Sequence, residues 1–167
     1  MNEKELLYNS DLERIRKFRL FDDDFMNICF DGDIELAELI IRIILGKPDL
    51  KVNRVETQKL IKSLIGRDIW LDIDATSAGR EYNIEIQRAD KGAEPERARF
   101  HSSMIDSHAL TPGSDFKELP DSYVIFITEN DVLGRGLPIY HVERKVEETG
   151  DVFGDREHII YVNRSEE

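Results

Sequence analysis

The sequence predicts a mixed α/β fold in which helices flank a central sheet that begins as an antiparallel hairpin. Residues 69–76 and 82–87 alternate between apolar and polar side chains, which is the period of two typical of β-strands. Residues 33–45 indicate a helix that is apolar nearly all round, as expected for a helix packed on a sheet. Residues 123–128 form a continuous apolar run, typical of an inner strand covered on both faces. This order of elements predicts one mixed sheet with helices against it.

The hairpin has a register that can be counted from the sequence. The two alternating segments are separated by Ser77, Ala78, Gly79 and Arg80, which predict a four-residue loop. Pairing across that loop gives these partners: Thr76–Glu81, Ala75–Tyr82, Asp74–Asn83, Ile73–Ile84 and Asp72–Glu85. Apolar residues then meet apolar residues, and a slip of one position would mix the two faces. The register is therefore well specified.

Capping signals delimit the helices. Asp33 is the expected N-cap of the apolar helix, and Gly46 with Pro48 ends it. A second helix is expected to begin at Glu94-Pro95, because proline favours the first helical position. That helix is expected to end near residue 110. A capping box predicts a short helix from 10 to 18. Strands are expected at 139–143 and 158–162.

Size and composition are those of one domain. The chain has 167 residues and 19.4 kDa, so a single unit spanning 1–167 is expected. No apolar run approaches the roughly 20 residues of a spanning helix, and the start carries no signal-peptide pattern. One cysteine, Cys29, excludes an internal disulfide and fits a reducing compartment. We therefore expect a cytoplasmic protein without a membrane partner.

The charge balance restricts the partners. With 35 acidic and 23 basic residues the net charge is -12, so no overall field attracts nucleic acid. Contact with phosphate would require a local basic strip or bound cations. A zinc site is not expected, because one cysteine and four scattered histidines show no ligand spacing.

Asp72 and Glu85 are the candidates for chemistry. Opposed residues on one face of an antiparallel pair have Cβ atoms about 5 Å apart. Two carboxylates at that distance in a partly apolar setting require a proton or a cation between them. Mg²⁺ takes one or two carboxylates together with waters and substrate phosphate, so the pair indicates a divalent metal site. Gln87 projects from the same face as Glu85, and its amide can hold a water or a phosphate oxygen.

A second interpretation of these residues stays open. They can equally be solvated polar residues on the exposed face of an amphipathic hairpin, since an acidic protein often has such faces. Asp74 lies on the same face, and we expect it to face solvent nearer the turn rather than to act as a ligand.

The motif has a family resemblance. Asp72, followed after a hairpin by Glu85-Ile86-Gln87, resembles the PD-(D/E)XK nuclease core in its D…ExQ variant. Further segments resemble the Rpn-type, recombination-promoting nuclease or putative transposase family of bacteria over residues 10 to 163. They are Phe-Asp-Asp-Asp-Phe-Met (21–26), Leu-Asp-Ile (71–73), Tyr-Asn-Ile-Glu-Ile-Gln-Arg (82–88), Arg-Ala-Arg-Phe (97–100) and Tyr-Val-Ile-Phe-Ile-Thr-Glu-Asn-Asp (123–131).

The resemblance implies a restriction-endonuclease-like fold and a Mg²⁺-dependent DNA endonuclease associated with recombination or mobile elements, with Mn²⁺ as a substitute metal. It implies that Asp72 and Glu85 ligate the metal and that Gln87 stands where the wider superfamily has its catalytic lysine. The metal must then supply more of the charge stabilisation. Asp22 best matches a further acidic ligand, with Asp23 and Asp24 as competitors. A helix N-cap is the other interpretation of Asp22.

The predicted helix after the hairpin carries basic residues. The resemblance implies phosphate contacts from Arg97 or Arg99, whereas a surface ion pair with Glu94 or Glu96 is the other interpretation of Arg97. His101 and His108 are expected to be packing or surface residues rather than acid–base catalysts. Family members usually continue into a further helical region, so a C-terminal helical extension is expected to be lacking here.

A non-catalytic function is the alternative hypothesis. The same fold could serve as an inactive acidic module that binds a protein partner; the net charge and Gln87 favour it, and the pair Asp72 and Glu85 disfavours it. The enzyme hypothesis predicts that Asp72, Glu85 and Gln87 converge in a cleft with Arg97 or Arg99 at its rim. The module hypothesis predicts a covered or splayed face. The DNA sequence preference and the assembly state, including a homodimer, stay open.

Overall fold

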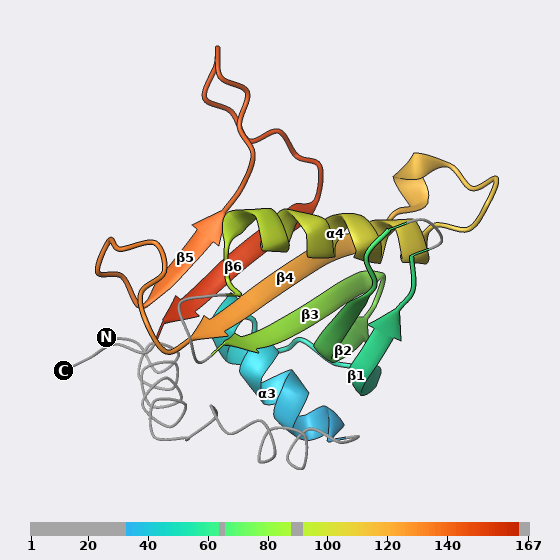
Figure 1. The fold of residues 1–167 in the computed structure, drawn as a ribbon, viewed down its shortest axis with the longest axis horizontal. Helices are drawn as coiled ribbons and strands as arrows, with labels where there is room; N and C mark the ends of the chain where they lie inside the picture. The colour runs from blue at the N-terminus through green and yellow to red at the C-terminus, as the bar shows by residue number, and fades with distance from the viewer. Residues whose placement is uncertain (1–32, 64–65, 88–91, 164–167) are drawn as a thin grey trace.

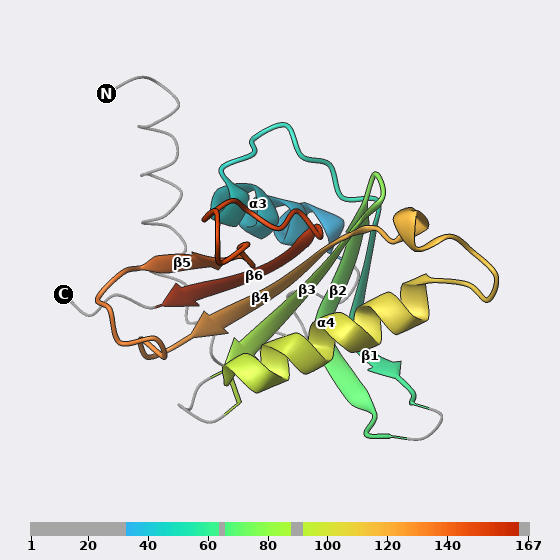
Figure 2. The ribbon, with the colours of Figure 1, turned by 90° about the horizontal axis from the view of Figure 1, so that it is seen from above.

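A six-stranded mixed sheet with one helix against each face forms the described part of the chain (Figures 1 and 2). The computed structural model describes residues 33–63, 66–87 and 92–163. Its elements are α3 (Ile34–Leu45), β1 (Arg54–Ile61), β2 (Ile69–Ser77), β3 (Arg80–Gln87), α4 (Pro95–Ala109), the 3-10 turn η1 (Phe116–Glu118), β4 (Asp121–Thr128), β5 (Ile139–Val142) and β6 (Glu157–Asn163).

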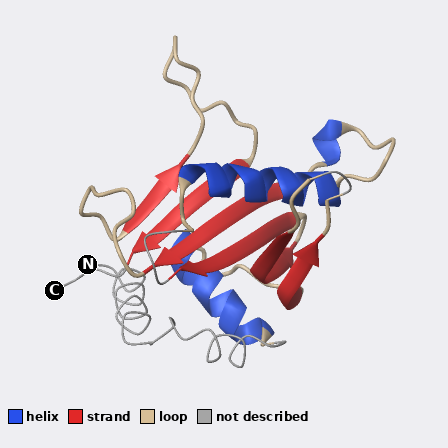
Figure 3. Cartoon of the chain, in the orientation of Figure 1, coloured by secondary structure: helices blue, strands red, loops and turns tan. Residues whose placement is uncertain are grey.

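The strands lie in the order β1-β2-β3-β4-β6-β5. The first three form an antiparallel meander, and α4 then makes the crossover that a parallel pairing of β3 with β4 requires. β6 continues the parallel part beside β4, and β5 pairs with it antiparallel at the edge. Figure 3 shows the helices on the two faces of these strands. The predicted α/β class, the mixed sheet and its antiparallel hairpin are confirmed.

The helix boundaries follow the capping signals. The Asp33 carboxylate accepts a hydrogen bond of 3.0 Å from the Leu36 N–H, and Gly46 ends α3 in the left-handed conformation with φ 61°. α4 begins at Pro95, as predicted, and ends one residue before the expected limit. The predicted helix at 10–18 lies outside the described residues, as do Asp22, Asp23, Asp24 and Cys29.

The turn between β2 and β3 is shorter than predicted. Ser77 and Arg80 pair with each other, so the loop consists of two residues, Ala78 and Gly79. Both have positive φ, 43° and 77°, which is the conformation of a tight hairpin turn whose twist matches the strands. The additional pair, Ser77–Arg80, continues the predicted pairing toward the turn, so the register of the other pairs is unchanged.

Strand β1 was not predicted from the sequence. It lies at the edge of the sheet beside β2 and is rich in charged and polar residues. Its few apolar residues divide between the two cores, with Val55 on the α3 side and Ile61 on the α4 side. Lys59 takes one of the inward positions. The apolar period that identified β2 and β3 is therefore weak in β1.

The apolar residues of β2 divide between two cores. Ile73 and Ala75 pack with α3, whereas Ile69 and Leu71 pack with Ala98 and the rest of the α4 side. Side chains at alternate positions of a regular strand would all lie on one face. The strand therefore changes faces between Leu71 and Ile73, at Asp72.

Candidate active site

In β1 and β2, the alternation of side chains between the two faces of the sheet is interrupted at neighbouring positions, Gln58 and Asp72. Gln58 has φ 51°, a left-handed conformation that is rare for a residue with a side chain. The antiparallel pairing runs from Thr57–Ile73 to Lys59–Leu71 without a Gln58–Asp72 pair between them. The Gln58 amide instead donates to Asp72 Oδ1 at 3.4 Å. The backbone irregularity in β1 thus lies beside the acid that the sequence singled out.

Asp72 and Glu85 lie together, but not as the expected ladder pair. Four of the five predicted partners are confirmed, from Ile73–Ile84 to Thr76–Glu81. Beyond them, the Asp72 N–H donates to Glu85 Oε1 at 3.2 Å, and the Ile86 N–H donates to Asp72 Oδ2 at 3.0 Å. Each carboxylate therefore accepts a hydrogen bond from a main-chain N–H of the neighbouring strand, as a main-chain carbonyl would in a regular sheet. The two acids share one small region because their side chains bridge the strands.

Glu85 is fully buried beneath α4. Its neighbours at alternate positions of β3 face the same side, and Asn83 is buried with it. The Asn83 amide donates to Glu85 Oε1 at 2.8 Å, and Arg97 Nη2 of α4 donates to Glu85 Oε2 at 3.1 Å. The Arg97 side chain is 37% exposed, so it reaches from solvent to a buried carboxylate. Its partner is thus Glu85 and not the Glu94 or Glu96 that the sequence suggested.

His101 closes these contacts into a ring. Arg97 Nε donates to His101 Nε2 at 3.3 Å, and His101 Nδ1 lies 3.2 Å from Asn83 Oδ1. Since Arg97 can only donate, Nε2 accepts and Nδ1 carries the proton that Asn83 accepts. The ring Arg97–His101–Asn83–Glu85 needs a neutral imidazole. Burial lowers the His101 pKa to about 4, and the positive charges of Arg97 and Arg67 act in the same direction.

The two acids compete for ionisation. Burial raises the pKa of Glu85 to about 7, and the negative charge of Asp72 adds to this. Hydrogen bonding from Asn83, the charge of Arg97 and the Asp72 N–H oppose the rise. The buried Glu85 carboxyl group is therefore stabilised by binding a proton or by additional positive charge beside it.

Gln87 lies at the end of β3 next to the Arg97 guanidinium. Gly92 shows this: a Cβ built there would lie 2.4 Å from Gln87 Oε1 and 2.9 Å from Arg97 Nη1. Gly92 also has φ +114°, a conformation that favours glycine. The absence of a side chain at Gly92 lets both polar groups approach the main chain.

Asp74 does not face solvent, so that prediction was wrong. It is 2% exposed and accepts hydrogen bonds from Lys59 Nζ at 2.6 Å and from Arg54 Nη2 at 3.1 Å. Both bases come from β1, the strand that the sequence did not reveal. Once two cations hold Asp74, its burial is compensated, and it is a structural ion-pair residue.

The other predicted site residues lie around this centre or outside the described chain. Arg99 is exposed on α4, two residues from Arg97, and His108 is exposed near the end of the helix. His101 is buried, as expected for a packing residue, but it also links the polar ring. Sequence reasoning missed Asn83 and this role of His101. The four-residue spacing of Arg97 and His101 on one helix face was the available signal.

The donor set partly fits a hard divalent cation. Two carboxylates that bridge neighbouring strands suit Mg²⁺, which completes its shell with waters and substrate phosphate. Within residues 33–63, 66–87 and 92–163, no group of three or more His, Cys, Asp or Glu side chains is placed to hold a metal. Arg97 now supplies the positive charge at Glu85 Oε2. A metal would therefore share or replace the Arg97 contact.

No protein-family model and no curated protein matches this chain. Among the described helices, none has both the length and the apolar composition needed to cross a bilayer.

Proposed function

We propose that this protein is a metal-dependent endonuclease that hydrolyses phosphodiester bonds in DNA. The observation that carries the proposal is the meeting of Asp72 and Glu85 across β2 and β3, one half-buried and the other fully buried. Such a pair offers a cation two oxygen ligands and leaves room in its shell for phosphate and water. The resemblance to the Rpn-type family points to the same two residues.

We also propose a restriction-endonuclease-like arrangement of the fold. The antiparallel β1–β3, the crossover through α4, and the parallel β4 and β6 support this assignment. In this arrangement the acids lie on the central strands, and α4 supplies basic residues beside them.

Each residue of the site has a distinct part in this proposal. Asp72 and Glu85 hold the cation, which when bound supplies an activated water and neutralises charge on the phosphate. The Arg97 guanidinium is 37% exposed, so it would contact a phosphate oxygen of the substrate from the solvent side of Glu85. Gln87 lies next to that guanidinium, and its amide orients a water or a phosphate oxygen. His101 and Asn83 hold Glu85 and Arg97 in position.

The net charge of -12 makes local cations decisive for DNA binding. Arg97 and the exposed Arg99 lie on α4, and the positive charge of Arg67 acts on His101 from the β1–β2 connection. Contacts of this kind position a phosphate backbone without reading sequence. We therefore expect weak, salt-sensitive binding that improves with a divalent metal.

A specific observation also supports the alternative, an inactive acidic module that binds a protein partner. Both oxygens of Glu85 already accept hydrogen bonds from the protein, so the carboxylate is satisfied without a metal. A chain that had lost catalysis could keep such a ring for stability alone.

A plasmid-nicking assay with Mg²⁺ or Mn²⁺ separates the two functions. The variants are Asp72→Asn and Glu85→Gln, which keep size and remove charge. Glu81→Gln is the matched control, because it changes a half-buried carboxylate on the same face of β3. The nuclease predicts that nicking drops by about 100-fold or more in the first two and stays in the control. Metal-dependent nicking that survives both site variants would overturn the site assignment, and a folded wild type without nicking would favour the binding module.

A further inference from the structure

A pocket of about 550 Å³ lies on the other face of the sheet, away from Glu85. It is formed by the loop that follows α3 and by the β2–β3 turn, and it includes Arg80 at the start of β3. Alternate residues of β3 after Arg80, namely Tyr82 and Ile84, belong to the core beneath α3. The pocket is therefore separate from the proposed nuclease site, and a ligand bound in it would not contact Glu85.

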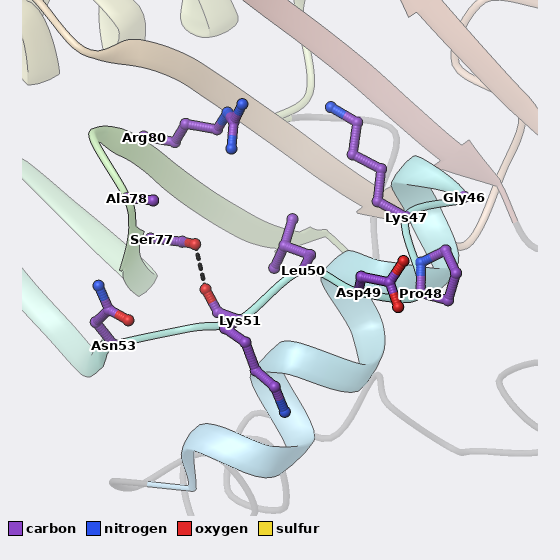
Figure 4. A pocket seen from close by; sticks show the side chains of 10 residues that line it. All are labelled: Gly46, Lys47, Pro48, Asp49, Leu50, Lys51, Asn53, Ser77, Ala78 and Arg80. Atoms are coloured by element: carbon purple, nitrogen blue, oxygen red, sulfur yellow. Dashed lines mark hydrogen bonds between the residues drawn. The ribbon is translucent and has the colours of Figure 1, made fainter.

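The pocket walls are held by contacts between the loop and the hairpin. The Ser77 hydroxyl donates to the Lys51 carbonyl (Figure 4). The Asn53 N–H donates to the Thr76 carbonyl at 2.8 Å. Arg42 Nε of α3 donates to the Leu50 carbonyl at 2.7 Å. These bonds fix the loop against both α3 and the turn, so the pocket is preformed.

Two basic side chains face each other across it. Figure 4 shows that Lys47 and Arg80 extend toward one another from opposite sides, while Lys51 points away along α3. Lys51 Nζ is engaged by Glu38 at 3.3 Å. Lys47 and Arg80 are thus the cations presented to an occupant, with Asp49 as the acidic residue of the lining.

A stack of aromatic rings lies beneath Lys47. Lys47 Nζ lies 5.9 Å from the centre of the Tyr123 ring, which stacks on Tyr82 at 4.8 Å and on His158 at 4.4 Å. Burial raises the pKa of Tyr82 to about 12, and the charge of Arg80 opposes this rise. The tyrosines therefore stay neutral, and they do not cancel the positive charge above them.

The hydrogen bonds of the Arg80 guanidinium, which lines the pocket, are incomplete. Arg80 Nε is buried and makes no hydrogen bond with the described residues. The nearest carboxylate, Asp121, lies 3.6 Å from Arg80 Nε and equally far from Arg156 Nη1, so it is shared between two bases at more than hydrogen-bond distance. Buried polar groups of this kind are usually completed by water or by a ligand.

We propose that this pocket binds a phosphate monoester group between Lys47 and Arg80. A monoester carries close to two negative charges at neutral pH, so it can neutralise both bases, whereas a single carboxylate neutralises one. Guanidinium and ammonium groups form strong, short hydrogen bonds to phosphate oxygens. The pocket volume exceeds that of phosphate alone, so a small organic group attached to the phosphate also fits.

The test is a titration of the full chain followed by amide NMR at constant ionic strength. The probes are inorganic phosphate, a nucleoside 5′-monophosphate and acetate. We expect saturable shifts at Gly46 and Gly79 with both phosphates, and tighter binding of the monophosphate if the organic group contributes. Equal affinity for both phosphates would still support the site and would identify the phosphate as the recognised group. No saturable shift, or shifts with acetate of the same affinity, would overturn the proposal.

Matched variants locate the binding. Lys47→Gln and Arg80→Gln should each weaken phosphate binding by roughly tenfold, whereas Lys145→Gln, which removes an exposed lysine elsewhere, should leave it unchanged. Lys47 is exposed, so we expect Lys47→Gln to fold. This variant therefore tests the site even where Arg80→Gln fails to fold. Wild-type affinity in Lys47→Gln would overturn the site. Because Lys47 lies outside the proposed nuclease centre, loss of phosphate binding with intact nicking would separate the two proposals.

Discussion

Arg97 and Glu85 form an ion pair of 3.1 Å in which the acid is fully buried and the base is 37% exposed. The pair joins α4 to β3, which side chains of the crossover helix reach because the helix packs over this face of the sheet. Arg97 is thus both the counter-ion of Glu85 and the side chain best placed to leave it for solvent. Stability and proposed chemistry depend on the same contact.

Removing the guanidinium should destabilise the protein. Arg97→Gln leaves the buried Glu85 without its positive partner, and we expect a loss of about 1–3 kcal/mol, less than for a fully buried pair because Arg97 is partly exposed. Urea unfolding at pH 8 measures it. Arg99→Gln, an exposed neighbour on α4, should change stability by less than about 0.5 kcal/mol. Equal effects of the two substitutions would mean that the ion pair contributes little.

The pH dependence of stability should contain two opposing contributions. The folded-state pKa of Glu85 is raised from 4.5 to about 7, so its contribution is full below pH 4.5 and is lost as the pH rises through about 7. The folded-state pKa of His101 is lowered from 6.5 to about 4, so its contribution is full above pH 6.5 and is lost as the pH falls through about 4. Between these limits the two changes partly cancel.

Variants should uncover each contribution separately. In Glu85→Gln the histidine contribution remains, so stability should rise from pH 4 to 6.5 by on the order of 1–3 kcal/mol. In His101→Phe the carboxyl contribution remains, and stability should fall from pH 4.5 to 7 by a similar amount. Urea midpoints across this range give the profiles, and His108→Phe is the exposed control. Profiles with the same slope in both variants would contradict the assignment.

A side chain at Gly92 should disturb Gln87 and Arg97 together. Gly92→Ala combines a strained backbone with a Cβ that would lie 2.4 Å from Gln87 Oε1. Gly113→Ala is the matched control, since Gly113 has φ +91° and no atom within 4 Å of an added Cβ. Both should lose about 1–2 kcal/mol from backbone strain. Only Gly92→Ala should also lower nicking, and equal nicking by the two variants would argue against a role for this contact.

Metal binding should raise the melting temperature and depend on pH. Because a cation must compete with the proton on Glu85, Mg²⁺ should stabilise the protein more at pH 8 than at pH 6. Thermal unfolding with increasing Mg²⁺ measures this, with Ca²⁺ for comparison and Glu85→Gln as the variant that should not respond. A flat titration at pH 8 would count against a preformed site.

Local sequence signals predicted the elements that depend on neighbours along the chain. Asp33 and Gly46 delimit α3 because capping bonds form within one turn. The hairpin register followed from alternation about a tight turn, and it survived an error of two residues in loop length because the centre of symmetry did not move. The proximity of Asp72 and Glu85 followed from that register.

Only the tertiary structure decided how those residues are used. The change of faces at Asp72 arises with an irregular backbone at Gln58 in β1, a strand whose polar sequence gave little period. Asp74 is buried because β1 supplies two cations, and Glu85 is buried because α4 lies over it and supplies Arg97 and His101. The sequence determined which acids are neighbours, since pairing across a turn is local. Packing between distant elements determined their burial, charge partners and protonation, because these depend on which side chains fill the space above the sheet.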